Sequence, residues 1–185
     1  MSIDIFIPTY FADFIWLEYC LKSIKKYASG FRNIIVVSDN DGNIIPDNIV
    51  NIMPIKLFYT PIPKIPTTYS GRPGYLWQQL LKINWVNYTD ADAVFILDSD
   101  EMLTKPLTPS LLRDDHGRFR WIYRNWGASN YGAGSADCWY EPTKSILKID
   151  PKFESMCCAG FIFERHTTHN FIEYLNESIF EYKFF

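Results

Sequence analysis

The stretch "AVFILDSDEMLTKP", residues 93–106, decides the fold of this chain. Its five apolar residues, 93–97, lead directly into the acidic segment 98–101, which reads Asp-Ser-Asp-Glu. A short, wholly apolar run predicts a strand buried on both faces, as in the middle of a parallel sheet. Three carboxylates within four positions repel one another unless solvent or a cation lies among them. The stretch therefore predicts a central strand that ends in an acidic cluster.

Strands and helices alternate along the residues that precede this stretch. Short runs rich in β-branched residues predict strands, and apolar residues at helical spacing predict the helices between them. The expected elements are strand 3–8, helix 11–28, strand 33–42, strand 55–61, helix 75–86 and strand 93–97. This order predicts an α/β fold with a mostly parallel central sheet between two layers of helices.

The rest of the chain has a weaker pattern. Residues 61–74 contain four prolines and two glycines, which is typical of an ordered loop at the rim of a site. Residues 117–125 alternate like a strand, and residues 126–142 are rich in glycine and aromatic residues, like a binding loop. The expected final elements are a helix within 143–149, a strand up to Phe163 and an amphipathic closing helix.

Size and composition limit the possible classes of protein. With 185 residues and 48% hydrophobic content, the chain is expected to form one domain, residues 1–185. A formal net charge of −3 excludes an overall basic footprint for holding a polyanion such as DNA. The four cysteines lack CxxC spacing, which favours reduced thiols in a cytoplasmic protein. No apolar run approaches the roughly 20 residues of a membrane helix, so we expect no membrane span.

Asp98 and Asp100 are the leading candidates for a binding site. Residues two apart in a strand point to the same side, and the carboxyl edge of a parallel sheet is where ligands bind. Mn²⁺ or Mg²⁺ prefers oxygen ligands, so the pair suits a metal ion held between the protein and a diphosphate. In the alternative interpretation, Asp98 caps the following turn and the other acids are merely solvated.

Three segments resemble the successive blocks of GT-A-fold glycosyltransferases. They are "FIPTYFADFIWLEYCLKSIKKY" (6–27), "RPGYLWQQLLKI" (72–83) and "AVFILDSDEMLTKPL" (93–107). More narrowly, they resemble a bacterial and phage group, catalogued as a domain of unknown function, with a Gly-Tyr/Trp-x-x-Gln-Gln-x-x-Lys helix ahead of Asp-Ser-Asp. The resemblance implies a GT-A-like (Rossmann-like) three-layer α/β/α sandwich. Residues 1–107 would bind a nucleotide-sugar, and residues 108–185 would form the acceptor side.

The resemblance also implies roles for single residues. Asp98 and Asp100 occupy the DxD position that binds the metal and the diphosphate. Pro8, Thr9 and Tyr10, at the end of the first strand, and Asp39, at the end of the second, occupy positions that contact the nucleoside. Alternatively, Pro8 and Thr9 only start a helix and Asp39 only forms a turn.

Polar residues around the second helix are further candidates for donor binding. Arg72 suits bidentate pairing with phosphate, and Gln78, Gln79 and Lys82 place polar groups on the helix before the acidic strand. Solvation at the surface explains any one of them alone. A pair of glutamines in an otherwise apolar helix requires partners if it is buried.

An inverting enzyme also needs a carboxylate that deprotonates the acceptor. Asp137 and Glu141 are the candidates, because aromatic residues on which a sugar can stack surround them, and Asp115 is a second option. The segment "DCWYEP" is equally consistent with a packed helix that has an acidic first turn.

His166 and His169 are the candidates for a further metal ligand, because GT-A enzymes often add a late histidine. Their spacing of three places both on one helix face. A polar helix start explains "ERHTTHN" equally well.

Three classes of function remain open. The first is a metal-dependent glycosyltransferase using a nucleotide-sugar, with UDP- or GDP-sugars favoured, and a carbohydrate or other hydroxyl acceptor. The second is a nucleotidyltransferase, against which "PTYFADF" counts because it has neither glycine nor a basic residue. The third is a non-catalytic nucleotide-sugar-binding module. A nucleic-acid acceptor is less favoured because the chain is acidic.

Overall fold

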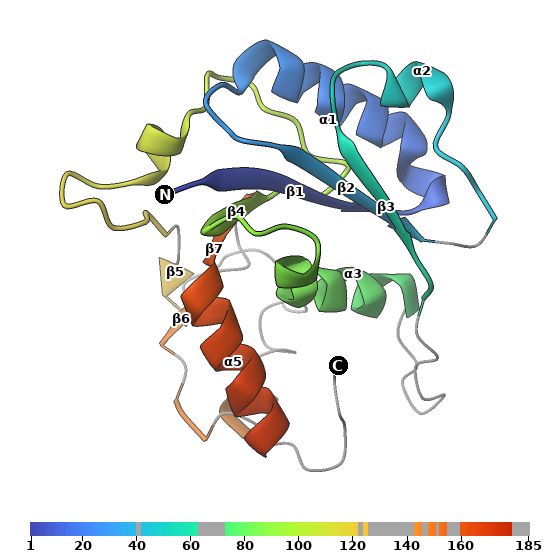
Figure 1. The fold of residues 1–185 in the computed structure, drawn as a ribbon. Coiled ribbons are helices and arrows are strands. Elements are labelled where there is room, and N and C mark those ends of the chain that lie inside the picture. Colours follow the sequence, from blue (N-terminus) through green and yellow to red (C-terminus); the bar gives the residue numbers. More distant parts are fainter. Residues whose placement is uncertain are drawn as a thin grey trace.

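A five-stranded sheet forms the centre of the computed structural model, with strand order β3-β2-β1-β4-β7 (Figure 1). The structure describes residues 1–39, 42–62, 73–121, 124–125, 143–145, 148–150, 152–154 and 160–178. The strands of the sheet are β1 (Ile3–Thr9), β2 (Ile34–Asp39), β3 (Lys56–Thr60), β4 (Ala93–Ile96) and β7 (Phe161–Glu164). The helices are α1 (Phe14–Tyr27), α2 (Asp47–Val50), α3 (Pro73–Ile83) and α5 (Arg165–Ser178). Short 3-10 turns are η1 (Phe11–Asp13), η2 (Asn84–Asn87) and η3 (Pro109–Leu112).

The sheet is mostly parallel. β1 pairs in parallel with β2 and β4, and β2 pairs in parallel with β3, while β7 runs antiparallel to β4. The predicted α/β class is therefore confirmed, and the acidic stretch does follow a central, fully buried strand. The strand and helix expected at the end of the chain are also observed, as β7 and α5.

Helices cover both faces of the sheet. Alternate residues of β1 point to opposite sides, as strand geometry requires. Ile5 and Ile7 are buried in one cluster with Leu21 of α1, whereas Phe6 is buried in a second cluster with Trp77 of α3. Figure 1 shows the same division, with α1 and α2 above the sheet and α3 below it. These two apolar layers hold the starts of α1 and α3 at one edge of the sheet.

The region after the acidic stretch differs from its expected form. A strand was expected over 117–125; of the described residues in that range, 117–121 and 124–125, Arg124–Asn125 form a strand, β5, which pairs with β6 (Phe153–Glu154). Asp114 instead accepts hydrogen bonds from the backbone N–H groups of His116 and Arg118, which closes a turn. Gly117 in this turn has a φ of 78°, a conformation that favours glycine. The turn brings Phe119 back beside Arg113, with which it forms an isolated antiparallel bridge, so the first part of the range is a turn and a bridge rather than a continuous strand. Only residues 143–145 and 148–149 of the helix expected within 143–149 are described.

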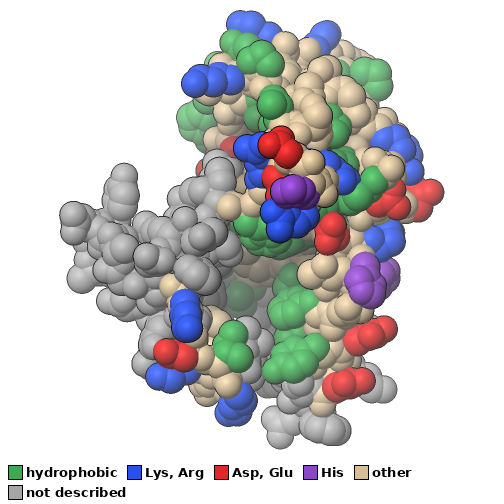
Figure 2. Space-filling view, turned by 90° about the vertical axis from the view of Figure 1, so that its left-hand side faces the viewer, with side chains coloured by type: hydrophobic (Ala, Val, Ile, Leu, Met, Phe, Trp, Pro, Cys, Tyr) green, Lys and Arg blue, Asp and Glu red, His purple; other side chains and the backbone are tan. Residues whose placement is uncertain are grey.

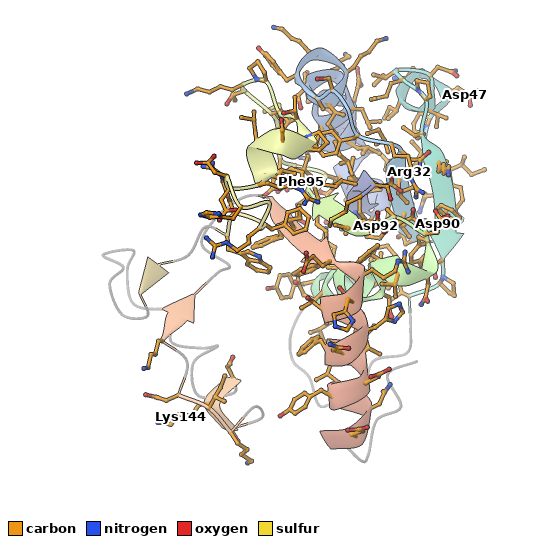
Figure 3. All side chains as sticks on the ribbon, turned by 60° about the vertical axis from the view of Figure 1, so that its left-hand side comes forward. Arg32, Asp47, Asp90, Asp92, Phe95 and Lys144 are labelled. Atoms are coloured by element: carbon orange, nitrogen blue, oxygen red, sulfur yellow. The ribbon has the colours of Figure 1, made fainter. Side chains whose placement is uncertain are left out.

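A network of polar groups closes the amino edge of the parallel strands. Arg32 donates two hydrogen bonds to the carboxylate of fully buried Asp4, at 3.0 and 2.9 Å, and also reaches Asp90 at 2.7 Å. Figure 3 shows Arg32 and Asp90 close together at this end of the sheet. Burial by itself would raise the pKa of Asp4, but hydrogen bonds from Arg32, Thr89 and Asn33 outweigh it and hold this pKa below its usual value.

None of the helices in the described part of the chain combines the length and the apolar character that crossing a bilayer requires.

Candidate functional site

The carboxyl ends of β1, β2 and β4 meet at one edge of the sheet. Thr9 lies opposite Ser38 in the β1–β2 ladder, and the backbone N–H of Leu97 donates to the carbonyl of Phe6 at 3.1 Å. Residues that follow these strands are therefore neighbours in space although they are far apart in the sequence. This is the edge at which open parallel sheets bind ligands.

The acidic segment forms a turn rather than a continuation of the strand. β4 ends at Ile96, and the Asp98 carbonyl accepts a hydrogen bond from the Glu101 N–H at 3.0 Å. In return, the Glu101 carboxylate accepts from the Asp98 N–H at 3.0 Å. Ser99 is fully buried, Asp98 is half-buried and Asp100 is exposed. The alternating geometry expected of a strand is thus replaced by a turn.

This turn borders a pocket of about 340 Å³. The pocket lies between the start of α1, the first turns of α3 and the acidic turn. The described residues that line it are Tyr10, Asp13, Gly74, Tyr75, Gln78, Asp98 and Asp100. Four of the seven, Tyr10, Gln78, Asp98 and Asp100, are site residues predicted from the sequence, so the structure does bring them together.

Lys82 contacts the acidic turn directly. Its ammonium nitrogen lies 2.6 Å from Oδ1 of Asp98. The two groups form an ion pair, although their angles do not meet those of a hydrogen bond. The Lys82 side chain is only 9% exposed and that of Asp98 27%. The sequence placed Lys82 among the donor-binding groups, but in this structure its charge is directed at Asp98. Lys82 therefore fixes the position of one of the two aspartates.

Asp13 is a pocket residue that the sequence did not single out. The Ser99 hydroxyl donates to its carboxylate at 3.5 Å, which joins the start of α1 to the acidic turn. Burial, together with the nearby charges of Asp100 and Asp98, raises the pKa of Asp13. Burial is also the main cause that raises the pKa of Glu101 to about 7, with Asp98 and Asp100 adding to it. The pocket thus carries an excess of negative charge despite Lys82.

Three of the predicted nucleoside-binding residues lie beneath the surface of this edge. Pro8 and Thr9 are buried in β1, and Asp39, the last residue of β2, is 1% exposed. The Ser38 hydroxyl donates to the Asp39 carboxylate at 3.2 Å. None of the three is among the described lining residues of the pocket, whereas Tyr10 is. In this structure Tyr10 alone of the β1-end candidates offers a side chain to a ligand there.

The structure does not bring His166 and His169 to the acidic turn. β7 runs antiparallel to β4, so α5 begins beside the amino end of β4, where the Arg165 N–H donates to the Asp92 carbonyl at 2.9 Å. Six residues of extended chain separate Asp92 from Asp98, which is about 15 to 20 Å. Both histidines are exposed in the first turns of α5. This placement agrees with the polar helix start, and the two histidines do not complete a metal site with Asp98 and Asp100 here.

Other candidates lie elsewhere. Arg72, Asp137 and Glu141 fall outside the described residues. Asp115 is described, and it is exposed in the turn that Asp114 closes, away from the pocket lining.

A second hollow, of about 700 Å³, lies beside α5. Phe119, Trp121, Phe163 and Phe171 line it together with polar residues that include Arg118. The rings of Trp121 and Phe163 are 6.1 Å apart. Figure 2 looks onto this face of the molecule, where hydrophobic side chains border a recess. A concave surface that combines aromatic side chains with several polar groups is typical of small-molecule sites.

The pocket beside the acidic turn, of about 340 Å³, could supply some of the ligands of a divalent cation. Asp98 and Asp100 both line it, and Asp13, whose pKa is raised by burial and by the charges of these two aspartates, adds a third carboxyl group. No group of three or more His, Cys, Asp or Glu side chains arranged to hold a metal occurs in the part of the chain that is described. The residues therefore fit an ion that takes its other ligands from water and a diphosphate, which is common for Mg²⁺.

No protein-family model and no curated protein sequence matches this chain. Among solved structures it is similar to TarS from S. aureus, with 22% identity over 57% of this chain and 18% of that one, and a TM-score of 0.38. The mannosyltransferase Ktr4p from S. cerevisiae gives 12% identity over 54% and 32%, with a TM-score of 0.40. The glycosyltransferase GlyE from Streptococcus pneumoniae TIGR4 gives 16% identity over 98% and 40%, with a TM-score of 0.48. This chain spans less than half the length of each, and likeness at this level concerns the fold alone.

Proposed function

We propose that this protein is a metal-dependent glycosyltransferase that transfers a sugar from a nucleotide-sugar to a hydroxyl acceptor. The observation that carries the proposal is the pocket at the carboxyl edge of the sheet, where Asp98 and Asp100 face Tyr10 and Gln78. The three segments that resemble GT-A glycosyltransferases fall on the elements that build this pocket. UDP- and GDP-sugars are the favoured donors, and Mn²⁺ or Mg²⁺ is the proposed cofactor.

The residues of the pocket have distinct proposed roles. Asp98 and Asp100 hold the cation, which when bound would offset the charge that develops on the leaving diphosphate. The ion pair with Lys82 keeps Asp98 in position. Tyr10, 38% exposed at the pocket, offers its ring to the nucleoside, and Gln78 offers an amide to the donor.

Within a single domain, we assign residues 1–107 to donor binding and residues 108–185 to the acceptor side. The hollow lined by Phe119, Trp121, Phe163 and Phe171 supports the second assignment, since aromatic faces suit stacking by sugar rings. Asp137 and Glu141 remain the proposed bases that deprotonate the acceptor hydroxyl.

Thermal unfolding in the presence of nucleotides tests the proposal. We expect UDP or GDP to raise the melting temperature only together with Mn²⁺, and we expect Asp98→Asn and Asp100→Asn each to abolish the shift. Asp47→Asn is the matched control, because Asp47 is exposed on α2 (labelled in Figure 3) and is not among the residues that line the pocket.

The other two classes of function predict different results in the same assay. Stabilisation by nucleoside triphosphates but not diphosphates would assign a nucleotidyltransferase. Metal-independent binding without hydrolysis of any nucleotide-sugar would assign a binding module. Either result contradicts the glycosyltransferase proposal.

A further inference from the structure

The outer face of α1 carries large hydrophobic side chains in contact with solvent. Ile15 is 60% exposed, Phe11 50%, and Trp16 and Tyr19 49% each. Phe11, Ile15 and Tyr19 are spaced four residues apart, so they follow one side of η1 and α1. The rings of Trp16 and Tyr19 are 6.5 Å apart, which extends the apolar surface sideways. We call these four residues the α1 apolar patch.

The same face of α1 becomes basic in its second half. Lys22 and Lys26 lie seven and eleven residues after Ile15, so helical periodicity places them in line with Ile15 and Tyr19. Glu18 is the only acidic residue of α1, and it pairs with Lys22 at 2.5 Å. The side chains of α1 therefore carry a net positive charge, although the whole chain has a formal net charge of −3.

The α1 apolar patch begins at the rim of the proposed active site. Tyr10 lines the pocket, and its ring meets that of Phe11 edge-on at 5.8 Å. Figure 1 shows α1 on the upper face of the sheet, with no described element lying over its outer side. A surface that contacts α1 would therefore lie beside the pocket.

We propose that the outer face of α1 docks onto an anionic membrane surface. Such a surface suits both halves of the helix. Aromatic and aliphatic side chains enter the boundary between headgroups and acyl chains, and lysines meet the lipid phosphates. A second copy of the chain suits it less, because it would bring the same lysines to the contact. Docking does not depend on the proposed function, but together with it places sugar transfer at hydroxyl acceptors presented at a lipid surface.

Co-sedimentation with vesicles tests the docking. We expect the wild-type chain to pellet with vesicles of phosphatidylcholine mixed with phosphatidylglycerol, and to be released by high salt. Each lysine near a membrane contributes about 1 kcal/mol, which is about fivefold in affinity. The double variant Lys22→Gln/Lys26→Gln should therefore bind about 25-fold more weakly. Ile15→Ser should weaken binding about tenfold, since it removes a side chain that inserts.

The chain offers a matched control for each change. Ile149 is 54% exposed, so Ile149→Ser removes an equally exposed isoleucine far from α1 along the chain. Lys144→Gln/Lys152→Gln removes two other exposed lysines, and Figure 3 shows Lys144 at the end of the molecule opposite α1. Both controls should bind like wild type. Circular dichroism should show that every variant folds.

Several results would overturn the docking. The first is that the chain stays in the supernatant with the mixed vesicles. The second is that it binds vesicles of pure phosphatidylcholine as well as the mixed ones. The third is that Ile15→Ser binds the mixed vesicles like wild type. A dimer that Ile15→Ser dissociates, without vesicle binding, would assign the patch to a second copy instead. Asp98→Asn should bind vesicles like wild type, because the docking surface does not include the pocket. Vesicle binding can therefore be confirmed even if the glycosyltransferase proposal fails.

Discussion

Gly160, immediately before β7, is a position where one methyl group should have a large effect. Its φ is +80°, a conformation that other residues rarely adopt. An added Cβ would overlap Cζ of Phe95 and lie 2.9 Å from its Cε2. Phe95 is 8% exposed in β4, so the surrounding core leaves its ring little room to move away. Gly160→Ala therefore combines backbone strain with overpacking.

The expected loss of stability follows from these two terms. The left-handed conformation costs a non-glycine residue about 1 to 2 kcal/mol. Overpacking a well-packed core costs about 1 to 3 kcal/mol more. A total of about 2 to 5 kcal/mol is a large part of the stability of a typical domain. For a chain of this size it corresponds to a fall in melting temperature of about 5 to 15 °C.

Thermal unfolding of Gly160→Ala beside Gly117→Ala separates the two terms. Gly117 has a φ of +78°, but a Cβ added there meets nothing within 4 Å. Gly117→Ala should thus show only the backbone cost, about 1 to 2 kcal/mol. The double variant Phe95→Leu/Gly160→Ala should lose less than the sum of its single changes, because the smaller side chain leaves room for the Cβ. Equal losses for Gly160→Ala and Gly117→Ala would refute the steric explanation.

Two further predictions concern charged groups. Because the pKa of Asp4 is lowered in the folded state, its ionisation stabilises the protein above the unfolded pKa, about 4, and this contribution is lost as the pH falls through the folded value. Arg32→Met should therefore cost about 2 kcal/mol in urea unfolding at pH 7 and less at pH 3, and an equal cost at both would contradict the linkage. Lys82→Met should lower stability by about 1 to 3 kcal/mol, since it leaves half-buried Asp98 without its ion pair. Lys82→Arg should restore most of this in thermal unfolding, and a loss as large as that of Lys82→Met would contradict the ion-pair explanation.

Much of the fold was predictable because its signals are local. The apolar run at 93–97 and the helical spacing in 11–28 depend on periodicity alone, and both elements are found as expected. At the start of the expected strand over 117–125, side-chain bonding by Asp114 and the conformation of Gly117 close a turn instead, and Arg124–Asn125 are the part of that range described as a strand. An alternating pattern of apolar and polar residues does not show that side-chain hydrogen bonds to the backbone will compete with strand pairing.

The candidate site was predictable only in part. The sequence identified Asp98 and Asp100, because an acidic cluster after a buried strand is visible in one stretch. Asp13 was missed, since nothing in "FADF" shows that its carboxylate faces the acidic turn. The pairing of Lys82 with Asp98 was missed as well, although both residues had been chosen.

The sequence by itself determined the succession of strands and helices, and with it the edge of the sheet at which the acids lie. Only the tertiary structure decided which charges meet there. In the folded protein Lys82 pairs with Asp98. Because β7 runs antiparallel to β4, His166 and His169 lie at the opposite edge of the sheet. The physical reason is that the periodicity of apolar residues is a property of neighbouring positions in the sequence. The direction of an edge strand and the partner of a buried charge depend instead on packing between segments far apart in the chain.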